Sequence, residues 1–141
     1  MMPGSRQTKR TVWPCVSGRD DDLAEDRAIF HGYAAAAIEG AISRNERICV
    51  HGDYDVDGTS STAMVLHFLR RIGAHADYHI PSRLDEGFGF TPRSVDRAHE
   101  AGAKVIVTVD VGVTASRAVD HARTYGIDVI VCDHHQAAEE I

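Results

Sequence analysis

Three kinds of feature are scarce or missing in this chain of 141 residues, and each absence narrows its function. The chain has only 3 cysteines and no CxxC pair, so it indicates neither a disulfide framework nor a zinc site built from thiolates. Its formal net charge is -6, which argues against a surface that coats nucleic acid generally, because such surfaces are usually strongly basic. A phosphate-bearing substrate would need metal ions or a local basic patch to attract it.

Long apolar runs are missing as well. No stretch approaches the ~20 residues that a membrane-spanning helix needs, and residues 1–6 lack the apolar character of a secretory signal. We therefore expect a cytoplasmic protein with no membrane partner.

The hydrophobic content and the length of the chain are those of one folded domain. With 43% hydrophobic residues the chain can bury one core, and its length favours a single domain. Residues 1–20 are polar and show no hydrophobic period, so we expect a disordered or mobile tail there. Residues 21–141 are expected to form the domain.

Strand-like and helix-like segments alternate within that domain. Apolar runs rich in β-branched residues predict strands, and apolar residues at helical spacing predict helices. The expected strands are 48–51, 76–80, 104–109 and 128–132, and the expected helices are 22–44, 59–72, 92–101 and a further one capped by Thr114. This alternation predicts an α/β fold of three layers, with a parallel sheet of about four strands and helices on both faces.

Polar clusters directly follow three of these strands. They are residues 52–58 (GDYDVDG), 109–112 (VDVG) and 133–135 (DHH). The carboxyl ends of parallel strands meet at one edge of a sheet, so the fold brings together residues about 80 positions apart. Converging carboxylates and imidazoles at buried strand ends need compensation, usually by a divalent ion. The sequence therefore predicts a metal site.

Each cluster also has a plainer interpretation. An aspartate at a strand end, such as Asp110, commonly caps the next turn. The run Asp-x-Asp-x-Asp-Gly opens a calcium-loop pattern, but Met64 and Val65 occupy the region where that pattern needs a glutamate. Residues 58–62 (GTSST) could hold a phosphate on backbone N–H groups, although helix capping explains them nearly as well. The position of all three clusters after strands favours the metal site.

Taken together, the three clusters closely resemble motifs I to III of the DHH phosphoesterase superfamily. The segment 80–90 (IPSRLDEGFGF) is similar to its RecJ branch, the single-strand-specific 5′ to 3′ DNA exonucleases. The resemblance spans roughly residues 22–141. It implies a hydrolase that uses two divalent ions, Mn²⁺ or Mg²⁺, to cut phosphodiester bonds of single-stranded DNA in DNA repair and recombination.

The resemblance also implies roles for individual residues. The implied metal ligands are Asp55, Asp57, Asp110 and His134, with His51 as a further candidate. The implied catalytic residues are His135, Asp133 and Asp53. Of these, His135 is expected to face the scissile phosphate, and Asp133 to orient a histidine. Arg83 and His135 are the expected substrate contacts.

Members of this superfamily continue past the third motif, with a fourth-motif aspartate and a carboxyl-terminal substrate-binding domain. We therefore expect a domain truncated before the fourth motif, which a missing carboxyl-terminal domain in cis or a partner chain completes. Two alternatives stay open. One is a non-catalytic module that binds a metal or a nucleotide, and the other is a DHH phosphoesterase that acts on small phosphate compounds.

Overall fold

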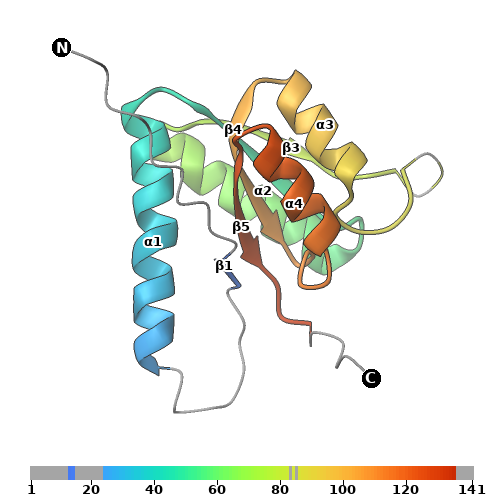
Figure 1. Cartoon of the computed structure of the whole chain (residues 1–141), viewed down its shortest axis with the longest axis horizontal. Helices are drawn as coiled ribbons and strands as arrows, with labels where there is room; N and C mark the ends of the chain where they lie inside the picture. The colour runs from blue at the N-terminus through green and yellow to red at the C-terminus, as the bar shows by residue number, and fades with distance from the viewer. Residues whose placement is uncertain (1–12, 15–23, 83, 85, 136–141) are drawn as a thin grey trace.

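The computed structural model describes residues 13–14, 24–82, 84 and 86–135 (Figure 1). Within these ranges, strands and helices alternate as the hydrophobic pattern predicts. In chain order, they are β1 (Trp13–Pro14), α1 (Ala24–Ser43), β2 (Arg47–Gly52), α2 (Val56–Arg71), β3 (His75–His79), α3 (Pro92–Glu100), β4 (Ala103–Val109), α4 (Ser116–Thr124) and β5 (Asp128–Cys132).

The strands form one parallel sheet in the order β1-β5-β4-β2-β3. From β2 the chain passes first to β3 on one side, and then crosses to β4 on the other. The strand order thus reverses at β2, and in sheets of this type ligands bind in the crevice at such a reversal, outside the carboxyl ends of the strands. The four strands and the parallel sheet expected from the sequence are confirmed.

Helices cover both faces of the sheet. One core lies under α1 and α2, and its buried members include Ala41, Ile48, Val50, Leu66, Leu69 and Val107. The other lies under α3 and α4, which sit side by side in Figure 1, and includes Cys49, Val95, Ile106, Val119 and Val129. Alternate residues of β2 and β4 therefore face opposite cores, which confirms the three layers. None of the helices within the described ranges has the length and apolar character that a bilayer span requires.

The sheet has a short edge strand that the sequence pattern does not show. Trp13 pairs with Ile130 and Pro14 with Val131, inside the segment expected to be a tail. The rest of that segment, 1–12 and 15–20, lies outside the described residues. A two-residue strand is too short to produce a hydrophobic period, and proline is tolerated at a sheet edge because it donates no ladder hydrogen bond there.

Two helices begin at residues other than those expected. Helix α2 starts at Val56 rather than at 59, because the Asp55 side chain accepts a hydrogen bond from the N–H of Gly58 and so caps the helix earlier. The expected cap at Thr114 is wrong. The N-cap of α4 is Ala115, which makes no side-chain cap hydrogen bond, because the chain turns tightly and the N–H of Ala115 donates to the carbonyl of Gly112.

Candidate metal centre

The first polar cluster folds back against the start of α2, and two glycines make this possible. A Cβ on Gly52 would lie 1.9 Å from Oγ1 of Thr62, and one on Gly58 would lie 2.4 Å from the carbonyl oxygen of Asp53. Thr62 itself donates to the carbonyl of Gly58 across 2.7 Å. The loop between β2 and α2 is therefore packed backbone against backbone, and its aspartates are presented from a tight turn.

The three aspartates of this turn have different local roles. Asp53 accepts a hydrogen bond of 2.7 Å from the N–H of Tyr54. Asp55 caps α2 through one oxygen, and Asp57 lies exposed in the first helical turn, where a negative charge complements the helix dipole. A carboxylate has about four lone-pair sites, so capping leaves Asp55 with acceptor capacity for a further partner.

Asp110 stands at the end of β4 in an unusual backbone conformation. Its φ is 60°, a left-handed value that aspartate adopts more readily than most residues, and its N–H donates to the carbonyl of Cys132 across 2.8 Å. Thr108 closes the same turn by donating to the carbonyl of Val111. These contacts hold the Asp110 carboxylate at the sheet edge with only 6% of its side chain exposed.

The third cluster follows β5, next to β4. Asp133 is buried and accepts hydrogen bonds from the N–H groups of Val113 and His135, at 3.0 and 3.1 Å. Its Oδ1 also lies 2.5 Å from Nδ1 of His135. Burial would raise the pKa of Asp133, but these hydrogen bonds outweigh it and hold the pKa below its ordinary value. The hydrogen bond to Asp133 raises the pKa of His135 and fixes its ring. Asp133 thus contacts both the N–H and the ring of His135, and its role in orienting a histidine stays a prediction.

The ends of β4 and β5 converge on one point. Nε2 of His134 lies 2.7 Å from Oδ1 of Asp110, and ligand atoms of Asp110, His134 and His135 all lie within 4.8 Å of one another. Asp55 lies near enough for its charge to raise the pKa of Asp110, and the charge of Asp53 acts on His135. A cavity of about 300 Å³ opens beside this group, between α2 and the strand ends, and is lined by Ser61, Met64, Val65, Val109, Asp110, Cys132, Asp133 and His134.

The donor set fits a divalent cation. Burial raises the pKa of Asp110, and the negative charge of Asp55 raises it further, although His134 offsets part of both effects. A nearby cation stabilises the ionised form of such a carboxylate, because it offsets both the burial and the repulsion from Asp55. Carboxylate oxygens with imidazole nitrogens suit manganese, whereas magnesium prefers oxygen ligands alone. The carboxylates and imidazoles gathered here are therefore chemically suited to bind a manganese ion.

His51, the further candidate ligand, is the last but one residue of β2 and lies beneath this edge. Its side chain is buried, and within the described part of the chain its Nε2 has no hydrogen-bond partner. Burial, with a smaller effect of His79, lowers the pKa of His51 to about 4. Its imidazole is therefore neutral near pH 7, the form in which histidine binds metals.

The structure does not unite every candidate. Of the expected metal ligands, Asp55, Asp57 and His51 fall outside the group of converging ligand atoms, whereas His135, expected to face the phosphate, belongs to it. Arg83 lies outside the described residues. Two residues close to the site were missed from the sequence: His79, whose ring lies against His51, and Glu86, which contacts His79. Glu86 lies in a loop and belongs to no periodic pattern, so the only signal in the sequence that could have indicated it is Gly87, the turn-forming residue after it.

Comparison with known proteins places the chain in a family. Residues 47–141 match the DHH family, N-terminal domain. The chain is 41% identical over 108 residues to the single-stranded-DNA-specific exonuclease RecJ of Bacillus subtilis (strain 168), an alignment that covers 77% of this chain and 14% of that protein. It is 45% identical over 103 residues to RecJ of Escherichia coli (strain K12), with 72% and 18% covered. The chain thus spans less than a fifth of these relatives' length.

Solved structures show the same likeness. A crystal structure of exonuclease RecJ bound to manganese superposes with a TM-score of 0.70 and 38% identity, over 77% of this chain and 28% of that one. RecJ from Thermus thermophilus in complex with Mn²⁺ gives a TM-score of 0.64 and 33% identity, over 77% and 15% of the two chains.

Proposed function

Because the chain belongs to the DHH family, we propose that it is the metal-binding core of a 5′ to 3′ exonuclease that hydrolyses single-stranded DNA. The observation that carries this proposal is the convergence of Asp110, His134 and His135 at the carboxyl edge of the sheet. The relatives from Bacillus subtilis and Escherichia coli, 41% and 45% identical to the chain, are named single-stranded-DNA-specific exonucleases. DNA repair and recombination in the cytoplasm is the setting we propose, since both processes produce single-stranded DNA.

We propose that Asp55, Asp57, Asp110 and His134, together with His51, hold two divalent ions, Mn²⁺ or Mg²⁺. Two such ions supply an activated water and neutralise the phosphate, so the reaction needs no serine or cysteine nucleophile. Relatives solved with manganese support the choice of ion. Asp55, Asp57 and His51 need a shift of side chain to join the converging group, and a bound ion supplies the attraction for such a shift.

The remaining residues are assigned to the substrate. Asp133 accepts from the N–H of Val113 and contacts Nδ1 of His135, which supports a fixed orientation of the exposed His135 ring. We propose that this ring faces the scissile phosphate. Asp53 lies near enough to act on His135 electrostatically and assists it. Arg83 remains a prediction for phosphate contact. Because the chain spans so little of its relatives, we propose that turnover also needs a further protein part, in cis or as a partner chain.

Calorimetric titration with Mn²⁺ tests the metal centre. We expect the chain to bind Mn²⁺ and Asp110→Ala to abolish binding, because Asp110 is the buried carboxylate of the group. The matched control is Asp120→Ala, which removes an exposed carboxylate of α4 that pairs with Arg123 in its own helix turn. Equal affinities of wild type and Asp110→Ala would contradict the proposed centre.

The same proteins are then incubated with 5′-labelled single-stranded DNA. Metal binding without degradation is the result expected of a core that needs a completing part, and adding that part should restore degradation. Robust degradation by the chain alone would show that no further part is needed. Metal binding that never leads to degradation, with the completing part present, would favour the non-catalytic module.

A further inference from the structure

Glu86 is a buried carboxylate in the loop between β3 and α3. Its side chain is only 3% exposed, although the loop runs over the surface and its neighbours Leu84 and Phe88 are 94% and 71% exposed. Removing a carboxylate from water is costly unless it is paired and hydrogen-bonded. A buried acid at the middle of a surface loop therefore calls for specific partners.

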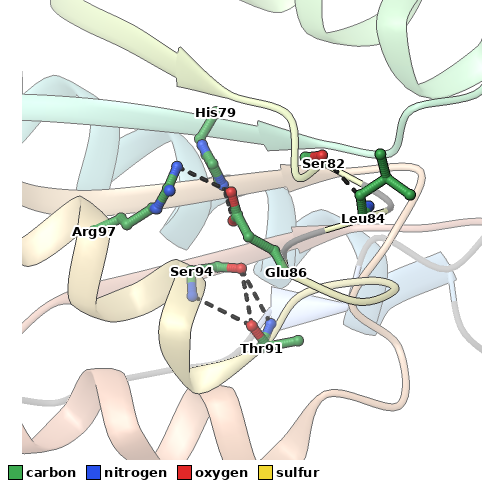
Figure 2. Close-up of polar contacts among 7 residues, drawn as sticks. All are labelled: His79, Ser82, Leu84, Glu86, Thr91, Ser94 and Arg97. Atoms are coloured by element: carbon green, nitrogen blue, oxygen red, sulfur yellow. Dashed lines mark hydrogen bonds and ion pairs between the residues drawn. The ribbon is translucent and has the colours of Figure 1, made fainter.

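The two oxygens of Glu86 have separate partners on different elements. Oε2 lies 2.7 Å from Nε2 of His79, the last residue of β3, and Oε1 lies 2.9 Å from Nη1 of Arg97 in α3. Figure 2 shows Glu86 between the two, with the Thr91–Ser94 capping box at the start of α3 beside it. Glu86 thus fastens the loop to both elements that the loop connects.

The chain turns sharply just after Glu86. Gly87 and Gly89 have φ values of 77° and 81°, in the left-handed region that glycine adopts most easily. This turn brings the loop back over His51. The ring of His51 hydrogen-bonds the backbone of Gly89, and its centroid lies 5.1 Å from that of Phe90.

His79 completes the surroundings of the same imidazole. Its ring centroid lies 5.4 Å from that of His51, at an interplanar angle of 42°. The contact with Glu86 uses Nε2 of His79, and so sets the rotation of the His79 ring against His51. Three contacts of His51, those with His79, Gly89 and Phe90, therefore depend on the segment that Glu86 anchors, while Nε2 of His51 is buried with no partner within the described ranges.

From these contacts we infer that Glu86 is a positioning residue: through His79 and the loop it anchors, it holds the His51 ring in the orientation that serves the metal centre. The inference rests on the proposed function, in which His51 is a metal ligand. Groups that orient a ligating histidine set metal affinity because they fix the ring and its tautomer before the ion arrives.

The test is Mn²⁺ affinity in Glu86→Gln, which keeps the shape of the side chain and removes its charge. We expect affinity to fall by about 10- to 100-fold, the usual cost of losing a group that orients a ligand. The matched control is Asp96→Asn. Asp96 makes a similar pair with His121 at 2.7 Å and also accepts from Tyr125, but its contacts lie between α3 and α4. Its loss should leave Mn²⁺ affinity unchanged.

A general loss of structure would weaken both variants alike, so equal losses in Glu86→Gln and Asp96→Asn would overturn the inference. Wild-type affinity in a folded Glu86→Gln would overturn it too. Should Glu86→Gln fail to fold, His79→Phe takes its place, since it keeps a ring against His51 and removes the ring nitrogens, including the one that meets Glu86. The same loss is expected, and unchanged affinity counts against the inference.

Nitrogen resonances of the His51 ring give a readout independent of metal. They should shift in Glu86→Gln and stay in place in Asp96→Asn, and the absence of any shift in the first variant contradicts the inference. Failure of the proposed function looks different: wild type itself then binds no Mn²⁺, or Asp110→Ala binds it unchanged.

Discussion

Gly58 lies where the first aspartate cluster meets the helix that follows it. The place that a side chain would take is already filled by the backbone of Asp53, whose carbonyl oxygen, carbonyl carbon and nitrogen lie within 2.4 to 2.7 Å of a Cβ built there. Asp55 and Asp57 belong to the turn that this contact closes, between residues 53 and 58. The absence of a side chain at Gly58 therefore determines the shape of the turn that presents them.

Gly58→Ala should destabilise the protein. Alanine favours a helix by about 1 kcal/mol over glycine, but forcing a methyl group into a filled space costs about 1–3 kcal/mol, so the net change is a loss. Urea unfolding measures it. Gly32→Ala in α1 is the control, because nothing lies within 4 Å of its Cβ, and we expect it to stabilise the chain slightly. A Gly58→Ala protein as stable as wild type would show that the turn can open.

At the scale of elements, the strands and helix interiors follow from hydrophobic pattern, whereas helix starts do not. A helix start depends on which side chain accepts hydrogen bonds from the first backbone N–H groups of the helix. Near residue 56, Asp55 and Thr59 both have side chains that can do so. Asp55 is the cap because Gly58, which has no side chain, lets the backbone of Asp53 pack against it, and the N–H of Gly58 donates to the Asp55 carboxylate. Near residue 115 the tight turn after Gly112 leaves Thr114 outside the cap position. The hydrophobic periodicity of the sequence does not show which residue caps either helix.

Helix α3 has the capping box that α4 lacks. The side chain of Thr91 accepts from the N–H of Ser94, and the Ser94 hydroxyl accepts from the N–H of Thr91. We expect Thr91→Ala to cost about 1 kcal/mol of unfolding free energy. Thr114→Ala, the same change beside α4, should cost less than about 0.5 kcal/mol. Chemical denaturation of both variants checks this, and equal losses would contradict the assignment of the caps.

At the scale of the whole molecule, acid should destabilise the fold through Glu86. Burial raises the pKa of Glu86, but the hydrogen bond from His79 and the charges of His79, Arg97 and Arg93 outweigh it, so the pKa lies below its ordinary value of 4.5. The folded state thus binds the proton less readily than the unfolded chain. The stabilisation is complete above pH 4.5 and is lost as the pH falls through the lower pKa of the folded state.

The test of this acid destabilisation is to measure the free energy of unfolding from neutral pH to below pH 4.5, with a chelator present to remove metal ions. Glu86→Gln should lose stability less steeply on acidification than wild type. Asp120→Asn should keep the wild-type slope, because exposed ion pairs such as that of Asp120 with Arg123 contribute little. Identical slopes in wild type and Glu86→Gln would show that Glu86 does not link acid to unfolding.

The layers, the parallel sheet and the edge that gathers the polar clusters are all predictable from the alternation of segments, because parallel connections leave few topologies open. The contacts within the site are less accessible. The contact of Asp110 with His134 follows from adjacent strand ends, and that of Asp133 with His135 follows from their closeness in sequence. The link from Glu86 through His79 to His51 depends instead on a loop path that two left-handed glycines produce. Glycine allows such a path without specifying it.

The strand order also decides when the proposed metal centre can exist. Its residues lie at or just after the ends of β2, β4 and β5, and β4 stands between the other two in the sheet. No local stretch of chain, however well folded, contains the set, so a molecule whose β5 has not yet joined the sheet offers no place where Asp110 and His134 meet. An ion held there would stabilise only the finished sheet, and its capture would mark the completion of folding.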